Sequence, residues 1–382
     1  MNHIFRDIIR LFVTGNVGTN RSRRNGTVLI VTMWIMLFLA GLVLVLTQMI
    51  RVEANCSANI QAEAEAAAIE RGAIQYVLAN VNGLQGKVPD PNNVPCEGVI
   101  LGNGAFWILR QSTNASNDDR TYRYGIVDEG GKLNLNNATA TMLSMLPNMA
   151  VDLPTAITDW RNPSGGTDSS YYLLLPDPYE SKNGPLETVE ELLWIKGASI
   201  KLLFGEDTNR NGVLDRNEDT TGDGRLDRGI YNLVTVYSRE QSRVGLINVN
   251  TAPREVLLCL PGLTDSDVAA LLAKRAQNTA GSTDTRWVAN ALSNEKAAAI
   301  RNLITGSTFQ FSADIVSIAG SGRAFRRCRI VIDASNSPPK VIYRQDWTGL
   351  GWPLQPQILA YLRAGKPLEQ IVPMQQARGM TL

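Results

Sequence analysis

The feature that most constrains this chain is an uncharged stretch of 24 residues near its N-terminus. Residues 27–50 contain no Asp, Glu, Lys or Arg, and Arg21, Arg23 and Arg24 precede them. As a helix rising about 1.5 Å per residue, the stretch would be about 36 Å long, enough to cross a bilayer core of about 30 Å. Basic residues before an apolar span favour a cytoplasmic N-terminus. We therefore predict a single-pass helix, with the rest of the chain across the membrane.

Two simpler interpretations of this stretch are a cleaved secretory signal and a plain anchor. A secretory signal has an apolar region of about 7–15 residues, shorter than this one, followed by small residues at its cleavage site. Here Arg51 and Glu53 follow, and then an alanine-rich helical pattern with no Pro or Gly before Gly72. We therefore predict that the membrane helix continues as an amphipathic helix over residues 51–81. A plain anchor stays open at this point.

Composition and charge exclude several classes of function. The 382 residues are 44% hydrophobic and 19% charged, which suits a globular protein of two or three domains with one span. Residues 1–26 carry a net charge of +4 and the remainder −3, so the main part is a poor candidate for nonspecific binding of a phosphate backbone. The single histidine, His3, excludes a catalytic triad or a His-ligated metal in the rest of the chain.

The four cysteines leave two states open. Cys56, Cys96, Cys259 and Cys328 have no CxxC spacing, which argues against a zinc or thioredoxin-like site. A disulfide is permitted in an oxidising compartment, and Cys56 and Cys96 are a plausible pair because one lies on the long helix and the other follows it. Four small buried thiols are the alternative.

Strand patterns occur in two groups far apart in the chain. Residues 82–100 are rich in Asn, Gly and Pro and predict a loop. Alternation of apolar and polar residues then predicts strands, with a polar turn after the first, at 105–111, 121–127, 308–319, 324–333 and 340–347. Because the first group is too small for a stable sheet, we expect it to pair with the second. Residues 356–362 predict a short helix within a C-terminal tail.

Two passages between these groups resemble each other. Residues 133–139 read LNLNNAT and residues 247–253 read INVNTAP, and a short helical pattern and a Leu-Pro follow each. The Asn-Asn-Ala-Thr sequence of the first passage and the Asn-Thr-Ala-Pro sequence of the second both suit a helix N-cap, and Pro253 suits a first helical turn. The second passage predicts a tight hairpin at residues 260–263 and a helix over 265–276, which is a helix-hairpin-helix pattern.

Such units often bind the DNA backbone, so a membrane-tethered DNA-uptake receptor is an alternative function. Thr264 replaces the second Gly of the usual Gly-hydrophobic-Gly hairpin, and Lys274 and Arg275 are the only clustered basic residues near it. We therefore consider DNA an improbable partner, and helical hairpins that pack among themselves the better interpretation. An anchored hydrolase is a third alternative, disfavoured by the absence of a second His.

Residues 207–218, DTNRNGVLDRNE, have the spacing of a calcium loop. A hard dication takes six to eight oxygen ligands, and such a loop supplies them at positions 1, 3, 5, 7, 9 and 12 with Gly at position 6. The matching ligands are Asp207, Asn209, Asn211, the carbonyl of Val213, Asp215 and Glu218, with Gly212 at position 6. We predict a structural calcium ion here. The alternative is an acidic, solvated turn.

The next twelve residues, 219–230, repeat this pattern less completely. Gly224 stands at position 6, but Ile230 occupies position 12, where an acid is expected. The candidate ligands are Asp219, Thr221, Asp223, Arg225 and Asp227. We predict a second, weaker calcium site.

The N-terminal boundary resembles that of type IV prepilins. In that family a prepilin peptidase cuts after a Gly that ends a basic leader, and the retained helix holds the subunit in the membrane and later in a filament. The resemblance implies a leader over residues 1–26 and cleavage between Gly26 and Thr27. Most such proteins have Glu at position five of the mature chain, where this sequence has Val31. In lacking this Glu, the sequence resembles one subgroup, minor pseudopilin K of type II secretion (general secretion pathway protein K).

Further motifs resemble that subgroup in the same order along the chain. They are an Asp-Glu-x-Gly-Lys run, an Asp-Trp-Arg step with Asn162 after it in place of Asp, a Tyr-Tyr and a Pro-Tyr, a Glu-Glu-Leu helix that ends in Gly, and Ile-Asn-Val-Asn-Thr-Ala. These motifs stand at residues 128–136, 159–161, 171–172, 178–179, 190–197 and 247–252. The resemblance covers residue 26 to about residue 350, and the order of the motifs is more specific than any one of them.

The resemblance implies an α+β fold in which an all-α part with helix-hairpin-helix-like units is inserted into a pilin-like α/β domain. We expect the pilin-like domain over residues 82–127 and 306–350, the insert over 128–305 with a calcium loop at 207–230, and the tail over 351–382. The implied function is that of a minor pseudopilin and not an enzyme. It would lie in the bacterial inner membrane with its bulk in the periplasm, and cap the pseudopilus tip with other minor pseudopilins. Val31 fits, because a subunit with no neighbour above it has no N-terminal amine to neutralise.

Overall fold

A computed structural model of the protein describes residues 25–90, 93–111, 121–166, 169–215, 217–238, 245–278 and 282–367. The chain divides into two compact units between Ile60 and Gln61. This boundary falls within one continuous helix, α2 (Asn25–Val81), which confirms the predicted long helix. Residues 1–24 of the predicted leader, the predicted turn at 112–119 and residues 368–382 of the predicted tail lie outside the described residues.

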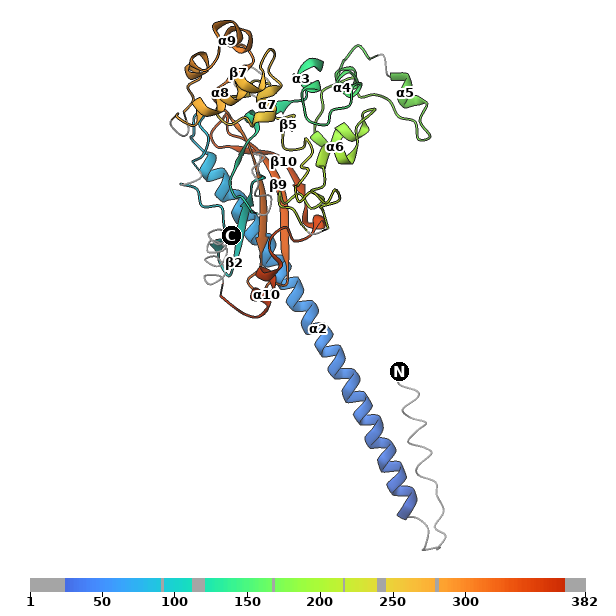
Figure 1. Ribbon diagram of the computed structural model, residues 1–382. Coiled ribbons are helices and arrows are strands. Elements are labelled where there is room, and N and C mark those ends of the chain that lie inside the picture. The colour runs from blue at the N-terminus through green and yellow to red at the C-terminus, as the bar shows by residue number, and fades with distance from the viewer. Residues whose placement is uncertain are drawn as a thin grey trace. The chain divides into compact units, whose positions relative to one another are not determined.

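The second unit is built on a six-stranded antiparallel sheet, shown in Figure 1. Its strands are β1 (Val99–Leu101), β2 (Gly104–Leu109), β3 (Val127–Asp128), β8 (Gln310–Ile318), β9 (Phe325–Asp333) and β10 (Lys340–Asp346). The order is β1-β2-β8-β9-β10, and β3 also pairs with β8. The early strand β2 runs beside the late strand β8 in a register that joins Ala105 to Ile318. The predicted pairing of the two strand groups is therefore confirmed.

The predicted strand over residues 121–127 is wrong for most of its length. Only Val127 belongs to a strand, and Tyr124 forms an isolated bridge with Leu109. Gly125 adopts a φ of 146°, a backbone conformation that other residues rarely adopt and that does not continue a ladder. The short strand β1, in contrast, lies partly within the predicted loop over 82–100.

The C-terminal part of α2 covers one face of the sheet. Alternate strand residues point to this face, because successive side chains in a strand point to opposite sides. Those of β8 that pack against Ile69, Ala73 and Val77 of α2 are Phe311, Ala313 and Ile315. Buried Glu70 of α2 accepts hydrogen bonds from Arg326 of β9 and Arg344 of β10. These contacts attach residues 61–81 to the sheet.

The opposite face of the sheet packs against α10 (Pro356–Arg363), through Ile358 and Leu362. The predicted helix over 356–362 is therefore confirmed. A short 3₁₀ turn, η4 (Thr348–Leu350), follows β10. The strands β8 and β9 also present polar side chains to this face, and these meet the segment that leaves the sheet after β3 and returns at β8.

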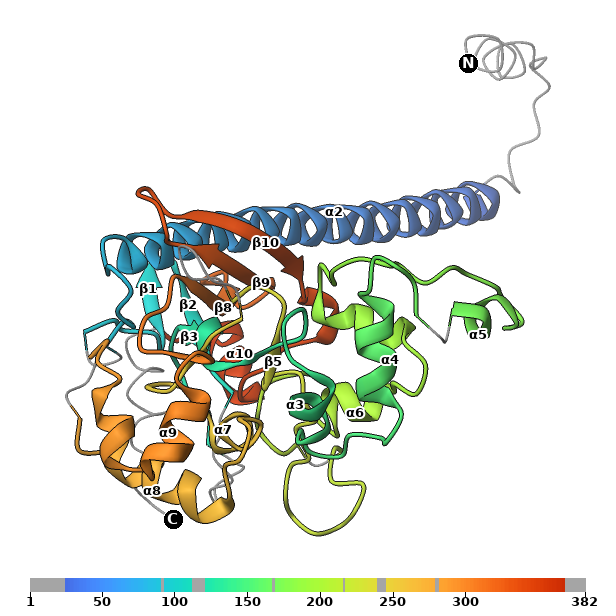
Figure 2. The same cartoon turned by 90° about the horizontal axis from the view of Figure 1, so that it is seen from above.

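Helices are the main regular elements of that inserted segment, which has its own hydrophobic core. The expected all-α insert is wrong in one respect, because the segment also contains two pairs of two-residue strands. Figures 1 and 2 both show two groups of helices, with α3 to α6 in one and α7 to α9 in the other. The first group comprises η1 (Glu129–Gly131), β4 (Leu133–Asn134), α3 (Ala140–Ser144), α4 (Leu153–Trp160), α5 (Ser169–Leu173), η2 (Val189–Trp194), α6 (Ile200–Phe204) and β5 (Val234–Thr235). The second comprises β6 (Ile247–Asn248), α7 (Arg254–Leu258), α8 (Asp265–Arg275), η3 (Arg286–Asn290), α9 (Asn294–Ile300) and β7 (Ile304–Thr305).

The two groups are copies of one skeleton, which we call the first copy (residues 133–235) and the second copy (residues 247–305). Each begins and ends with a two-residue strand, and the two strands pair in parallel, β4 with β5 and β6 with β7. Each also contains an inward-pointing arginine. Arg161 donates to carbonyls 26 and 23 residues before it, and Arg275 does the same at the same separations. The resemblance between the two sequence passages therefore reflects a repeated structure.

Candidate functional site

Helix α2 is the candidate membrane segment. Among the described residues it is the helix that is long and apolar enough to cross a membrane by length and composition, with a mean hydropathy of 2.8 in its most apolar window. The predicted cleavage point between Gly26 and Thr27 falls at the start of this helix. The large hydrophobic side chains of residues 28–50 are exposed in the structure, so they are available to lipid or to other helices.

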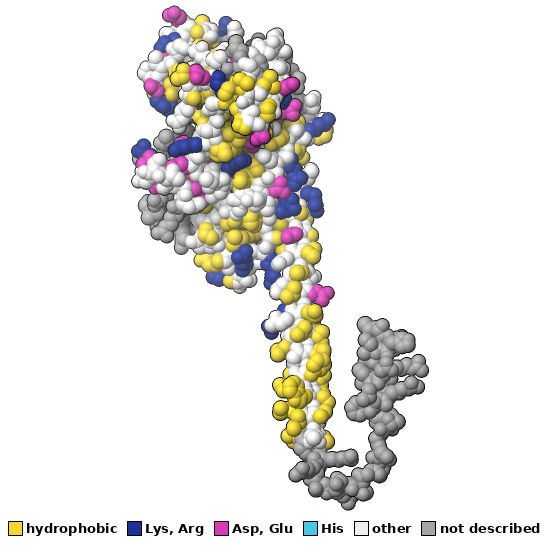
Figure 3. All heavy atoms as spheres, turned by 90° about the vertical axis from the view of Figure 1, so that its right-hand side faces the viewer, with side chains coloured by type: hydrophobic (Ala, Val, Ile, Leu, Met, Phe, Trp, Pro, Cys, Tyr) yellow, Lys and Arg dark blue, Asp and Glu magenta, His cyan; other side chains and the backbone are white. Residues whose placement is uncertain are grey.

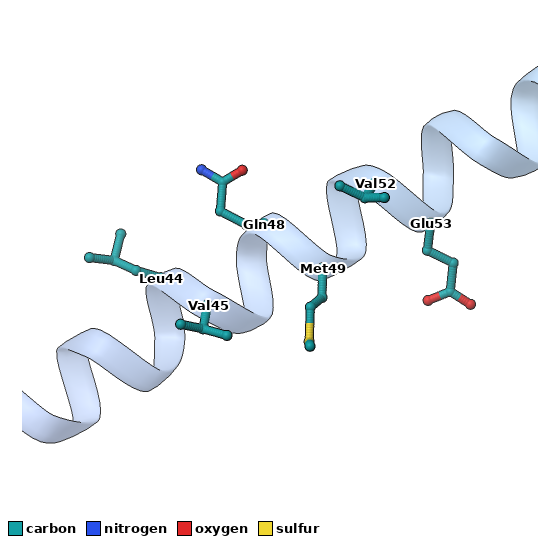
Figure 4. Close-up of a pocket in the computed structure, with 6 residues that line it drawn as sticks. All are labelled: Leu44, Val45, Gln48, Met49, Val52 and Glu53. Atoms are coloured by element: carbon teal, nitrogen blue, oxygen red, sulfur yellow. The ribbon is translucent and has the colours of Figure 1, made fainter.

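A shallow, open surface follows one side of this helix (Figure 4). Its lining residues are Leu44, Val45, Gln48, Met49, Val52 and Glu53. All six come from a single helix, so the surface is a helix face and not an enclosed ligand pocket. Only Gln48 and Glu53 are polar, which suits a face that packs against apolar partners near the end of the span.

The loop over residues 207–218 is wound by hydrogen bonds from its own backbone to the predicted ligands. Asp207 accepts from the amide N–H groups of Asn211 at 3.0 Å and Gly212 at 2.9 Å. Asn209 Oδ1 accepts from Asn211 N at 2.9 Å, and Asn211 Oδ1 accepts from Val213 N at 2.7 Å. Gly212 turns the chain with a φ of 76°, which favours glycine. The side-chain oxygens of positions 1, 3 and 5 are thereby held along one side of the turn.

Glu218 closes the same loop from its other end. Its side chain is buried, and it accepts from the backbone and hydroxyl of Thr208, at 2.9 and 2.8 Å, and from Asp215 N at 3.2 Å. Asp215 Oδ2 in turn accepts from the amides of Asn209 at 2.6 Å and Asn211 at 3.1 Å. The structure therefore brings the side chains predicted as ligands into one hydrogen-bonded loop.

Two buried carboxylates, Asp207 and Glu218, belong to this loop. Burial raises the pKa of Asp207 to about 7, and the Glu218 carboxylate adds to the rise. A dication would stabilise both charged carboxylates. In the parts of the chain that the structure describes, no group of three or more His, Cys, Asp or Glu side chains is arranged to hold a metal ion. A cation here would therefore depend on amide and main-chain oxygens as well as on carboxylates.

The second loop is wound in the same manner. Asp219 accepts from the N–H groups of Gly222 at 2.7 Å and Gly224 at 3.2 Å, and Asp223 accepts from Arg225 N at 2.9 Å. Asp227 accepts from Gly229 N at 3.1 Å. Thr221, the remaining predicted ligand, is exposed.

Glu206 is a residue that the sequence analysis did not single out. Its side chain is 5% exposed, its N–H donates to the carbonyl of Asp227 at 2.7 Å, and one carboxylate oxygen accepts from the hydroxyl of Thr220. The other carboxylate oxygen is buried and has no hydrogen-bond partner among the residues that the structure describes. A buried carboxylate thus lies against the loop whose twelfth position, Ile230, lacks an acid. Spacing did not reveal it because Glu206 precedes both loops.

The first loop is attached to the sheet by Arg327 of β9. This side chain is fully buried and forms a two-point ion pair with Asp314 of β8. It also donates to the carbonyls of Asn209 and Arg210 in the loop, the latter at 2.7 Å. Arg327 therefore connects the order of the loop to the packing of the sheet.

Two consecutive acids at the end of β3 connect the sheet to the insert. Asp128 accepts from the Asn248 amide at 2.9 Å and from the Thr251 hydroxyl, both in the second copy. Glu129 accepts from Thr235 of the first copy, and also from Ser312 and Lys132.

Burial affects the pKa of these neighbouring acids differently. Burial raises the pKa of Asp128, whose hydrogen-bond partners are neutral. Burial would also raise the pKa of Glu129, but Lys132 and Arg329 hold it at about 2. The Asp-Glu-x-Gly-Lys motif is therefore a structural junction.

The structure bears on two alternatives left open by the sequence, the state of the cysteines and the DNA-binding hairpin. All four cysteines are free thiols, with Cys56 exposed and the others buried. Arg275, one of the two basic residues considered for DNA, donates to the carbonyls of Val249 and Ala252 within its own copy. Its guanidinium is therefore occupied inside the insert.

Comparisons with known proteins point to one family. The family model described as type II secretion system (T2SS), protein K matches residues 247–305, the whole second copy, which confirms the resemblance indicated by the motifs. No curated protein matches the sequence significantly. The chain is similar to one in the crystal structure of the GspK-GspI-GspJ complex from the enterotoxigenic Escherichia coli type 2 secretion system. The two are 13% identical with a TM-score of 0.48, over 78% of this chain and 98% of that one.

Proposed function

We propose that this chain is a minor pseudopilin of bacterial type II secretion, with a structural and not a catalytic role. The observation that carries the proposal is a protein K family segment in the insert of a chain that also has α2, a helix suited to crossing a membrane. The continuity of α2 supports it, because the same helix that suits the membrane packs on the sheet further along.

In this proposal a prepilin peptidase cuts between Gly26 and Thr27 at the cytoplasmic side of the inner membrane. The retained helix spans the membrane once, and the residues after it lie in the periplasm. There α2 packs against the helices of other pseudopilins. The insert blocks the addition of a subunit above, so this subunit caps the tip of the pseudopilus and takes part in protein export.

Coexpression with the I-type and J-type minor pseudopilins of the same genome tests this function. We expect a tag on this chain to recover both partners in fixed ratio after detergent extraction. An unrelated periplasmic protein with the same tag and one membrane helix controls for co-extraction. Recovery of this chain alone, while the I-type and J-type proteins associate with each other, would contradict the proposal.

We also propose that calcium binds the loop over residues 207–218 and, more weakly, the loop over 219–230. The donor set is all oxygen, as calcium prefers, and the backbone hydrogen bonds hold it in order. Glu206 supports the second site, because one of its carboxylate oxygens has no partner among the described residues and could take the place of the acid missing at position 12 of the loop. In this proposal the ions stabilise the insert and take part in no reaction.

Equilibrium dialysis of the full chain in detergent with radioactive calcium tests both sites. We expect two bound ions per chain at millimolar calcium. Asp207→Asn with Glu218→Gln should remove the tighter ion, and Glu206→Gln should remove only the weaker one. Glu187→Gln, at an exposed carboxylate outside both loops, is the matched control. Retention of no calcium by the wild-type chain would overturn both sites.

A further inference from the structure

The exposed large hydrophobic side chains of the insert are unevenly distributed. Within the described part of the insert, all of them lie in the first copy, at Met145, Val151, Tyr171, Leu173, Leu174, Leu193, Trp194 and Ile200. Figure 3 shows hydrophobic side chains gathered on the side of the second unit that carries α5 and α6 in Figure 1. Because the two copies share one skeleton, the skeleton itself does not require this exposure.

Six of these residues form what we call the α5–α6 face: Val151, Tyr171, Leu173, Leu174, Trp194 and Ile200. Contacts between their segments join them. The Lys196 ammonium lies 5.0 Å from the centre of the Tyr171 ring, which joins α5 to the turn before α6. Gly197 faces Leu153 with room for little more than a methyl group between them, which places that turn beside the start of α4.

Packed aromatic rings support this face from beneath. Tyr179 donates from its hydroxyl to the carbonyl of Trp194 at 2.6 Å, and its ring centre lies 5.6 Å from that of Trp194. Behind it, Tyr172 lies 5.3 Å from Tyr179 and 5.1 Å from Trp160. Trp194 is 60% exposed and Leu174 is 85% exposed, although both stand on this packed base. Exposed aromatic and aliphatic side chains held in place are typical of the centre of a protein interface.

The charge around the face is acidic. Residues 133–204 contain eight acidic and four basic residues, whereas the second copy contains five acidic and six basic ones. The exposed charged residues flanking the face include the acids Asp152, Asp177 and Glu180 and the base Lys201, and the half-buried Lys196 lies against Tyr171, so the acids exceed the bases by one. A partner that covers the apolar residues would therefore be attracted if it carried basic side chains around its own apolar residues.

We propose that the α5–α6 face docks a different protein, whose contacting surface is apolar with a rim of Lys and Arg. A second copy of this chain fits poorly, because a symmetric contact would set one acidic rim against another. Anionic lipid surfaces and nucleic acids would be repelled by the same charge. This inference is independent of whether α2 assembles with other pseudopilins.

Site-specific photo-crosslinking in the natural host, followed by direct binding, tests the proposal. A benzophenone amino acid at Leu174 should give a crosslink to one other protein, and the same probe at Ala269, exposed on α8 of the second copy, should not. The captured protein is then purified, and its affinity for the full chain in detergent is measured. We expect Leu174→Asp to weaken binding at least tenfold, with Ala269→Asp as the matched control that leaves it unchanged.

The charge component is tested by salt and by reversal. Raising the salt from 50 to 300 mM should weaken binding several-fold, and Asp177→Lys with Glu180→Lys should weaken it and reduce this salt dependence. Both variants alter exposed residues, and an unchanged thermal unfolding temperature will show that the insert is intact. A crosslink only to a second copy or to lipid, no crosslink, or an affinity unaffected by Leu174→Asp would each overturn the proposal.

Discussion

The two copies of the insert share a skeleton and differ in what is added to it. In the second copy, α9 ends at Ile300 and β7 begins at Ile304, so the skeleton is almost bare. In the first copy, α6 ends at Phe204 and β5 begins only at Val234, and both oxygen-rich loops lie between them. The first copy also carries α5 and its exposed apolar face. Repeated residues thus maintain the fold, the added loops carry the proposed ion sites, and α5 together with exposed side chains of the skeleton carries the proposed partner site.

The junction with the sheet holds the two copies by different means. Asp128 bonds to the second copy through neutral partners, and Glu129 bonds to the first copy within a cluster that includes Lys132 and Arg329. Substitutions of Asp128 and Glu129 therefore test most directly how the sheet holds the two copies.

The largest expected effect is that of Glu129→Ala. It leaves Lys132 buried without its partner, and breaking a buried pair in this way costs about 3–5 kcal/mol. Asp128→Asn, which loses bonds to neutral groups only, should cost about 1–3 kcal/mol. The free energy of unfolding is measured by urea denaturation in detergent with tryptophan fluorescence. Equal costs for the two variants would refute the contrast.

The same two acids should respond to pH in opposite directions. The pKa of Glu129 is lowered from 4.5 to about 2, so its stabilisation is complete above pH 4.5 and is lost as pH falls toward 2. The stability difference between wild type and Glu129→Gln should therefore shrink by about 3 kcal/mol over that range. The pKa of Asp128 is raised, so its native state gains stability relative to Asp128→Asn as pH falls. Parallel pH profiles for the two differences would contradict this assignment.

Calcium should stabilise the first copy and leave the second copy unchanged. At 100 times its dissociation constant, an ion bound only to the native state stabilises it by about 2.7 kcal/mol. We expect this stabilisation to appear as slower amide hydrogen exchange in α6, β5 and the loops between them, with no change in α7 to α9. The measurement compares the full chain with calcium and with a chelator. Uniform protection of both copies would show that the ion acts on the whole insert.

The inward arginines test whether the copies are independent. Arg161→Met and Arg275→Met each remove two hydrogen bonds from a charged donor to main-chain carbonyls, and each should cost about 2 kcal/mol. Hydrogen exchange should speed up only in the copy that carries the substitution. If either variant loosened both copies equally, the insert would be one cooperative unit.

The smallest expected effect concerns helix starts. Thr264 caps α8 of the second copy in a capping box with Asp267, whereas Asp152 makes no side-chain cap bond at the start of α4 in the first. Thr264→Ala should cost about 1 kcal/mol and Asp152→Ala close to nothing. Thermal unfolding of both variants checks the difference. A comparable loss from Asp152→Ala would mean that the cap does not distinguish the two helices.

Much of the fold could be predicted from the sequence because it depends on local periodicity. The apolar run of α2, the alternation in β8, β9 and β10, and the repeated Asn-rich passages are all readable within a few residues. The spacing of the loop over 207–218 likewise predicted its candidate ligands, and the structure shows these side chains bonded within one loop. The presence of calcium there stays a prediction.

What could not be predicted depends on contacts between distant residues. The strand expected over 121–127 failed because Gly125 leaves the extended conformation there. Glu206 became a candidate only when Thr220 and Asp227 were seen beside it. The inward roles of Arg161 and Arg275 were also hidden, because their carbonyl partners precede them by more than twenty residues.

The central claim is that the chain is a processed minor pseudopilin held by α2. The most direct test is the intact mass of the full chain after coexpression with a prepilin peptidase, with a peptidase inactivated at its catalytic site as control. The account predicts loss of residues 1–26, so that the mature chain begins at Thr27. A chain that keeps these residues in the presence of an active peptidase, one that processes a known prepilin in the same cells, would contradict it.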